Sequence, residues 1–177
     1  MNPVTEAIEN DSIASLQKLV EEGVDITKPI IIGEEYELDD YDDISPLFYA
    51  IRKYASMELI EFLLQNGAEL TECDSDGVSA LDMAIKFKRK DVIKFCIDQG
   101  FDLNSTKRKS GIKPLMLACC FSDLEMIQML LDHGAELNAF DNTGMSAKDY
   151  AKKLGQKKTL EFLEEKGARF KAYPNED

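Results

Sequence analysis

Hydrophobic residues recur at helical spacing ahead of a set of regularly placed glycines. Apolar residues follow an i, i+3, i+4 pattern, as in Ile60, Leu63 and Leu64, and this pattern predicts a helix with one buried face. A glycine follows each such segment, where a helix commonly ends in a left-handed residue. These glycines are Gly23, Gly67, Gly100, Gly134 and Gly167. The pattern therefore predicts one short helix before each glycine.

A second helix is expected ahead of each of these. An alanine stands sixteen or seventeen residues before each glycine, at Ala7, Ala50, Ala84, Ala118 and Ala151. The segments "SPLFYAI" (45–51) and "SALDMAI" (79–85) place a serine before proline or alanine, which is a common helix start. The glycines are 44, 33, 34 and 33 residues apart. A helix–turn–helix unit therefore repeats along the chain.

This repeat resembles the ankyrin repeat family. The segments "DSDG" (74–77) and "DNTG" (141–144) are turn signals ahead of two units. The fullest copy of the family pattern is "GIKPLMLACCFSDLEMIQMLLDHGAELNAFDNTG" (111–144). The resemblance implies an all-α repeat solenoid of stacked helix–turn–helix units with β-hairpin fingers. We expect one domain over 1–170, with repeats at about 1–26, 40–73, 74–106, 108–140 and 141–170, an enlarged hairpin finger at 27–43 and a flexible tail at 171–177.

The chain departs from the family pattern at two kinds of position. The family's histidine is replaced in every unit, by Thr5, Phe48, Asp82, Met116 and Asp149. We therefore expect the hydrogen bonds of that histidine to be absent and packing to carry more of the stability. Lys148 and Glu164 replace apolar residues of earlier units, which predicts a polar outer face for the last repeat.

The resemblance implies that a partner protein binds the concave side, through the hairpin tips and the exposed flank of each first helix. At the last variable position before the turn between helices stand Lys53 or Tyr54, Phe87, Phe121 and Leu154, preceded by Arg52, Lys86, Cys120 and Lys153. An exposed aromatic stripe flanked by cations suits a binding hot spot. The alternative is that both phenylalanines fold under the turns as packing.

The hairpin tips supply a second row of candidate residues. Ile44, Val78, Ile112 and Met145 are all apolar and directly follow the turns. They either join neighbouring hairpins or contact a partner. Asp76 and Lys109 lie beside them in the turns and belong to the same candidate surface.

An acidic insertion separates the first two repeats. The stretch "IIIGEEYELDDYDDISP" (30–46) holds seven carboxylates between residues 34 and 43, and these cannot be buried unpaired. It is either a solvated spacer or a surface for a partner with a basic patch. The candidate contact residues are Glu35, Tyr36, Asp40, Tyr41 and Asp42. Cations gather instead in "KFKRK" (86–90) and "STKRKSGIK" (105–113).

Composition narrows the class of partner. With 34 acidic and 21 basic residues, the net charge of −13 argues against binding nucleic acid or an anionic membrane. Cys73, Cys96, Cys119 and Cys120 form no C-x-x-C pair, which predicts free thiols in a reducing compartment and a cytoplasmic location. No apolar run has the length of a membrane span.

The sequence carries no motif of catalysis. It has neither a glycine-rich phosphate loop nor H-E-x-x-H, and its one histidine is His133. We expect no catalytic residue, no metal ligand and no cofactor, and we expect a monomer. The leading interpretation is a non-enzymatic interaction module or adaptor that binds another protein. The alternative is a carrier of a small ligand or cofactor, haem or a metal, that uses tyrosine, His133 or cysteine.

Overall fold

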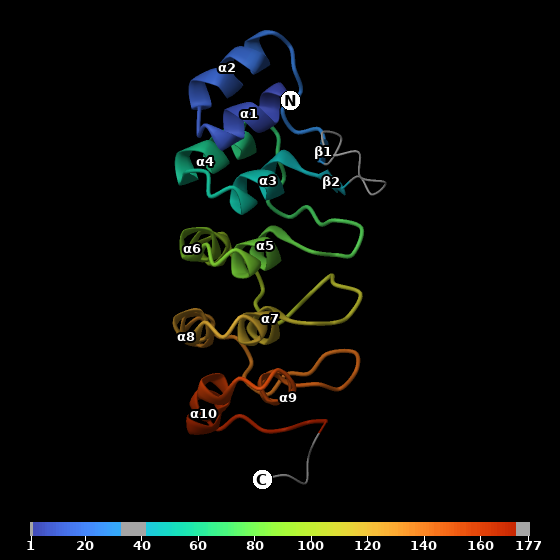
Figure 1. The fold of residues 1–177 in the computed structure, drawn as a ribbon, viewed down its shortest axis with the longest axis vertical. Coiled ribbons are helices and arrows are strands. Elements are labelled where there is room, and N and C mark those ends of the chain that lie inside the picture. The colour runs from blue at the N-terminus through green and yellow to red at the C-terminus, as the bar shows by residue number, and fades with distance from the viewer. Residues whose placement is uncertain (1, 33–41, 173–177) are drawn as a thin grey trace. The chain divides into compact units, whose positions relative to one another are not determined.

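The structure is a computed structural model that describes residues 2–32 and 42–172 (Figure 1). These residues form the elements α1 Pro3–Glu9, α2 Ile13–Glu21, β1 Ile30–Ile32, β2 Asp42–Ile44, α3 Pro46–Arg52, α4 Met57–Gln65, α5 Ala80–Lys86, α6 Lys90–Asp98, α7 Pro114–Cys120, α8 Leu124–Asp132, α9 Ala147–Lys153 and α10 Lys157–Glu165. Helices of seven residues alternate with helices of nine. This alternation confirms the predicted fold class of repeated helix–turn–helix units.

The chain divides into two compact units, Met1–Asp74 and Ser75–Asp177. In the first unit α1 packs on α2 and α3, and α3 packs on α4. In the second unit α7 packs between α5 and α9, and each of these three helices packs on the helix that follows it. The loops ahead of α7 and α9 extend away from α8 and α10 (Figure 1).

A short hairpin in the first unit begins the predicted enlarged finger. Strands β1 and β2 are antiparallel, with Ile30 opposite Ile44 and Ile32 opposite Asp42. Ile30 is buried and Ile31 is exposed, as the side-chain alternation of a strand requires. Four of the candidate contact residues, Glu35, Tyr36, Asp40 and Tyr41, lie outside the described residues.

Serine side chains begin half of the helices. Their hydroxyl oxygens accept a hydrogen bond from the backbone N–H three residues later, at Ser12, Ser45, Ser56, Ser79 and Ser146. Proline begins α1, α3 and α7, where its missing N–H costs nothing. Isolated helices of seven to nine residues are unstable in water, so these caps and the packing between helices hold them together.

Small residues lie where the seven-residue helices pack. Ala84, Ala118 and Ala151 are fully buried in α5, α7 and α9, and their short side chains let these helices approach closely. The longer helices bury leucines such as Leu130. Past the end of α8, Gly134 has φ +93°, as the glycine pattern predicted. None of the helices in the described ranges combines the length and the apolarity needed to cross a membrane.

Aspartates replace the family's histidine as hydrogen-bond acceptors in two units. Asp82 and Asp149 form capping boxes with Ser79 and Ser146. Asp149 accepts from the Ser146 N–H at 2.7 Å and from the Ser146 hydroxyl at 2.6 Å. The histidine itself is absent, as expected, but this position still makes hydrogen bonds in these two units, because a carboxylate at the third helical position reaches the cap.

Asp149 also holds the segment 169–172. It accepts hydrogen bonds from the backbone amides of Lys171 at 2.9 Å and Ala172 at 3.2 Å. Arg169 donates its N–H to Asn138 at 2.7 Å and its carbonyl accepts from Ser146 at 3.0 Å. The first two residues of the expected flexible tail are therefore tied to α9, and residues 173–177 lie outside the described part of the chain.

Lys148 does not lie on a polar outer face as the sequence predicted. Its side chain is only 6% exposed, with Nζ 3.6 Å from the Glu164 carboxylate. Nζ also lies 4.1 Å from the centre of the Phe170 ring. The segment that Asp149 anchors therefore brings an aromatic ring over the lysine, and a cation–π contact compensates its burial.

Neighbouring loops of the second unit touch through their backbones. The Lys109 N–H donates to the Asp76 carbonyl, and the Asn142 N–H donates to the Ser110 carbonyl, both at 3.2 Å. Gly77 lies at the first of these contacts with φ +79°, and a Cβ added there would stand 1.9 Å from the Lys107 carbonyl oxygen. Only glycine fits this approach between two loops.

Replacing Gly77 with alanine is expected to destabilise the protein more than replacing Gly100. Both glycines have φ near +80°, but a Cβ at Gly100 meets nothing within 4 Å. Both variants should therefore lose about 1 kcal/mol from the left-handed backbone, and Gly77→Ala should lose about 1–3 kcal/mol more from the clash. Urea unfolding of the two variants measures the difference. Equal losses would mean that the loops separate at no cost.

Replacing Asp149 with asparagine is expected to remove a pH-dependent part of the stability. Burial raises the pKa of Asp149, but hydrogen bonds from Ser146, Lys171 and Ala172 outweigh it and the net pKa is lowered. A carboxyl with a lowered pKa in the folded state stabilises the protein above its unfolded pKa of about 3.9 and stops doing so as the pH falls through the folded value.

Asp149→Asn should therefore be less stable than wild type at pH 7, by about 1–3 kcal/mol, and the gap should close below about pH 4. Thermal unfolding between about pH 3 and pH 7 tests this. Asp82→Asn is the matched control, because Asp82 also closes a capping box. A gap between Asp149→Asn and wild type that stays constant with pH would contradict the assignment.

Candidate functional site

Three apolar side chains form a strip across the second unit. Phe87, Phe121 and Leu154 are the C-cap residues of α5, α7 and α9. These helices pack side by side, so the three residues occupy equivalent positions on neighbouring helices. We call these three side chains the apolar strip. Phe87 and Phe121 are half-buried, whereas Leu154 is 50% exposed. Each phenylalanine therefore packs with part of its surface and offers the rest to solvent.

The structure settles which residue of the first unit corresponds to this strip. Lys53 is the C-cap of α3. Tyr54 comes one residue later with φ +59°, matching Lys88 at +54° and Ser122 at +53°. Lys53 is therefore equivalent to Phe87. Tyr54 is 62% exposed and corresponds to Lys88.

An acidic residue engages this position in the first unit. The Lys53 ammonium lies 2.6 Å from the Glu9 carboxylate, and the Tyr49 hydroxyl donates to the same oxygen at 2.6 Å. Hydrogen bonds from Lys53 and then Tyr49 lower the pKa of Glu9. Arg52, one residue earlier, is exposed. This end of α3 therefore presents cations, one of which is already paired.

Cations also precede the apolar strip. Lys86 and Lys153 are exposed in the last turns of α5 and α9, and the half-buried Cys120 holds the same position in α7. The Lys86 ammonium lies 5.6 Å from the centre of the Phe87 ring. This is the predicted combination of aromatic and basic side chains, now placed at adjacent helix ends.

Arg108, in the loop ahead of α7, acts electrostatically on Cys120 and Tyr150. Burial raises the pKa of the Cys120 thiol, and the positive charge of Arg108 opposes that rise. Burial and a hydrogen bond to Asp141 raise the pKa of Tyr150, and the same arginine again opposes the rise. The charge of Arg108 therefore acts on both Cys120 and Tyr150.

Tyr150 was missed by the reasoning from sequence. Its hydroxyl donates to Asp141 at 2.5 Å. Burial alone would raise the pKa of Asp141, but hydrogen bonds from Tyr150 and Thr143 lower it. The sequence did contain a signal for it. Tyr150 stands three residues after the start of α9, where α5 and α7 have the apolar residues Met83 and Leu117, so its hydroxyl group departs from the pattern of the repeat.

Two charged residues of the hairpin turns, Asp76 and Lys109, form an ion pair between neighbouring loops. The Lys109 ammonium and the Asp76 carboxylate are 3.0 Å apart, and both side chains are more than 70% exposed, at 72% and 73%. An ion pair this exposed contributes little stability. The apolar row of hairpin tips, Ile44, Val78, Ile112 and Met145, is half-buried throughout. Each of its members therefore keeps some exposed surface.

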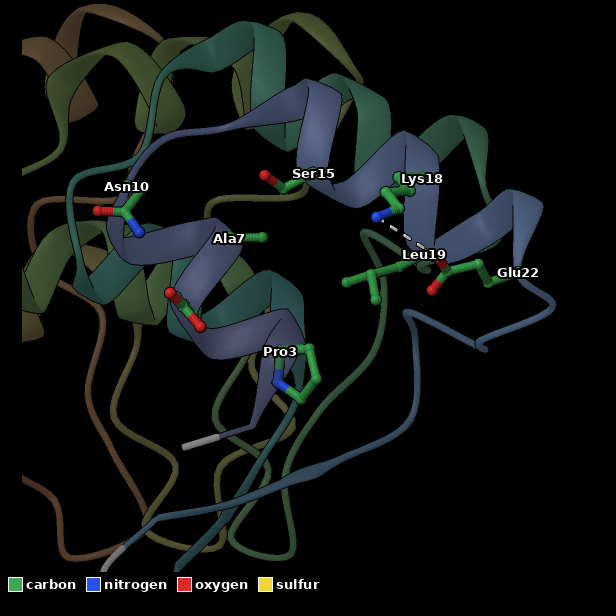
Figure 2. A pocket seen from close by; sticks show the side chains of 8 residues that line it. Pro3, Ala7, Asn10, Ser15, Lys18, Leu19 and Glu22 are labelled. Carbon is green, nitrogen blue, oxygen red and sulfur yellow. Dashed lines mark ion pairs between the residues drawn. The ribbon is translucent and has the colours of Figure 1, made fainter.

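A hollow of about 260 Å³ lies between α1 and α2, and Figure 2 shows the residues that line it. Pro3, Ala7 and Leu19 supply its apolar surface, and its polar lining residues are Glu6, Asn10, Ser15, Lys18 and Glu22. The Lys18 ammonium lies 3.7 Å from the Glu22 carboxylate. No histidine or cysteine is among the lining residues.

A second, shallower groove of about 540 Å³ runs between α8 and α10. Its apolar residues include Leu124, Met129 and Phe162, and its rim includes Glu125, Gln128, Asp132 and His133. A ring nitrogen of His133, Nδ1, lies 2.7 Å from the Met129 carbonyl oxygen. The histidine is the C-cap of α8, a position that favours a cation.

Cofactor or metal ligands do not gather in the part of the chain that the structure describes. No group of three or more histidine, cysteine, aspartate or glutamate side chains there could hold a metal ion. All four cysteines are free thiols. Burial raises the pKa of Cys96 and of Cys119 to about 12, so both are protonated at neutral pH and neither is a reactive thiolate.

The chain is similar to several curated proteins. It is 32% identical over 118 residues to an ankyrin repeat protein of Acanthamoeba polyphaga mimivirus, which covers 67% of this chain and 15% of that protein. It is 29% identical over 110 residues to the B-cell lymphoma 3 protein homolog of Mus musculus, covering 62% of this chain and 25% of that protein.

One relative is named as an enzyme. The chain is 27% identical over 162 residues to an L-asparaginase of Dirofilaria immitis, covering 92% of this chain but only 25% of that protein. The chain thus spans a quarter or less of each of these three relatives. Their activities therefore do not pass to it.

The family comparison covers nearly the whole chain. The model for ankyrin repeats, built from three copies of the repeat, matches residues 5–107 and 97–173. The helix–turn–helix units and the hairpin seen in the structure agree with this match. The chain belongs to the ankyrin repeat family.

Proposed function

We propose that this chain is a non-enzymatic adaptor that binds another protein through the apolar strip and the loops beside it. Ankyrin repeats generally mediate protein–protein interaction, and the family is typically non-enzymatic. The observation that carries the proposal is the recurrence of Phe87, Phe121 and Leu154 at one register of three packed helices. We take this face to be the concave side that the family resemblance implies.

The fold itself does not require apolar side chains at these positions. The caps are made by backbone groups, since the N–H of Phe87 donates to the Met83 carbonyl at 3.0 Å and the N–H of Leu154 donates to the Tyr150 carbonyl at 3.0 Å. Any residue with a backbone N–H can make such a bond. Partly exposed aromatic and aliphatic residues near cations are typical of binding hot spots, so they support a binding role.

In the first unit we propose a separate set of contact residues on the basis of residue type. Arg52, Lys53 and Tyr54 occupy the same positions at the end of α3. The acidic insertion, with Asp42 at its end, remains part of the proposal from its sequence alone. The free thiols favour a reducing compartment, and we propose that the adaptor acts as a cytoplasmic monomer.

Removing the two phenylalanines of the strip is expected to abolish partner capture. Phe87→Ser/Phe121→Ser is compared with Phe95→Ser/Phe162→Ser, because Phe95 and Phe162 are also half-buried but lie on α6 and α10. Hot-spot residues each contribute about 2 kcal/mol or more. The strip variant should therefore lose bound partner by about tenfold or more.

The measurement is affinity capture from cells of the source organism with quantitative mass spectrometry. Thermal unfolding verifies that both double variants are folded at the capture temperature. The proposal holds if a protein captured by wild type and by the outer-helix variant is lost with the strip variant. It fails if the strip variant captures the same proteins in the same amounts.

A further inference from the structure

Cations lie at two of the helix ends that carry the apolar strip and in the loop ahead of α7, although the chain has a net charge of −13. Lys86, Lys88 and Lys153 lie at the ends of α5 and α9, and Lys107, Arg108 and Lys109 lie in the loop ahead of α7. The lysines are exposed and the arginine is half-buried. The charge of this face is therefore opposite to that of the whole molecule.

Several of these cations form no ion pair within the part of the chain that the structure describes. Lys88, Lys107 and Lys153 take part in none of the ion pairs found among the described residues. Lys86 contacts an aromatic ring. Lys109 is paired with Asp76, but this pair is exposed to solvent and can exchange partners at little cost.

The carboxylates nearby are already occupied. Asp82 and Asp149 are buried in capping boxes. Asp141 is buried and accepts hydrogen bonds from Tyr150 and from Thr143. These groups serve the fold, so they do not balance the exposed lysines.

Some cations at the longer helices of the same unit are paired, whereas Lys94, Lys157 and Lys158 take part in none of the ion pairs found among the described residues. Lys90 is paired with Asp123 and Glu125, and Arg89 contacts Asp91 at 2.7 Å. The strip face combines such exposed cations with the apolar strip, as Lys86 does beside the Phe87 ring.

Helix electrostatics explain part of the pattern but not all of it. A lysine in the last turn stabilises a helix through the negative end of its dipole, and Lys86 and Lys153 are in that position. Lys107 and Lys109 are in a loop, and Lys88 lies beyond the C-cap of α5. The helix dipole therefore does not explain why these three positions hold lysine.

We infer that the segment of the partner bound by this face is an acidic peptide stretch that carries apolar anchor residues. This inference rests on the proposed function and names its partner class. The apolar strip takes the anchors, and the surrounding cations pair with the carboxylates and orient the segment. A surface that combines an excess of positive charge with apolar side chains is complemented best by a ligand that carries both negative charge and apolar side chains.

A polypeptide fits this face better than a single-stranded nucleic acid. Bases stack on exposed aromatic platforms, whereas Phe87 and Phe121 are half-buried and the third position is Leu154. The Asp76 carboxylate beside Lys109 would also repel a phosphate backbone. An acidic peptide avoids both problems. Its aliphatic side chains suit the strip, and its sequence can space the carboxylates so that none of them faces Asp76.

The test is selection of peptides from a displayed random library against the full chain. Peptides of about 12 residues are long enough, since they extend to about 40 Å and three packed helices are about 10 Å apart. Selected peptides are then synthesised, labelled with fluorescein and titrated by anisotropy at low and high salt. We expect sequences enriched in aspartate and glutamate with interspersed aromatic or aliphatic residues.

Charge reversal on the strip face gives the matched comparison. Lys86→Glu/Lys107→Glu/Lys153→Glu is expected to weaken binding of the selected peptides by about tenfold or more. Lys94→Glu/Lys157→Glu/Lys158→Glu changes the net charge by the same amount with exposed lysines of α6 and α10. This control should bind like wild type.

Each outcome separates the inference from the proposed function. Selected peptides without acidic enrichment, or peptides that bind the strip-face variant as well as wild type, would overturn the acidic partner while the binding module stands. Selection of no peptide that prefers wild type over Phe87→Ser/Phe121→Ser would count against the proposed function itself. Tighter binding of a fluorescein-labelled oligo(dT) of the same length would assign the face to nucleic acid and overturn the inference.

Discussion

The close approach of the seven-residue helices is the constraint on which each unit depends. A helix of seven residues does not persist alone in water, so α5, α7 and α9 form only because they bury one another. Ala84, Ala118 and Ala151 permit this, since their side chains are fully buried and small. A larger residue there would separate the helices and overpack the core. The alignment of the helix ends, and with it the apolar strip, follows from this packing.

Buried carboxylates explain how an acidic protein can present a basic face. Caps and turns of the second unit use the carboxylates of Asp82, Asp141 and Asp149 as hydrogen-bond acceptors. Their negative charges are therefore directed at backbone amides and hydroxyl groups. Among the lysines around the strip, Lys88, Lys107 and Lys153 take part in none of the ion pairs of the described residues, and the pair of Lys109 with Asp76 is exposed to solvent. Local charge is therefore set by which residues the fold uses for hydrogen bonding and not by the net charge of the composition.

Repeat spacing was enough to predict the helices, the turns after them and the family, because these depend on residues close together in sequence. The roles of Asp149 and Lys148 could not be predicted in this way. Both depend on residues 169–172, about twenty positions later, which return to α9. The choice between Lys53 and Tyr54 required the backbone angle of Tyr54, since both side chains are plausible at a helix end. Whether Phe87 packs or binds was also open from the sequence; the half-buried ring packs in part and leaves the rest of its surface to solvent.

Caps made only by backbone groups have a consequence for how such a protein can change over time. The equivalent positions already hold a lysine, two phenylalanines and a leucine, at Lys53, Phe87, Phe121 and Leu154. Substitutions there leave the hydrogen bonds that end each helix in place. Natural variation can therefore alter recognition one repeat at a time while the scaffold is inherited unchanged. Relatives that share the fold can diverge in what they bind without first having to regain stability.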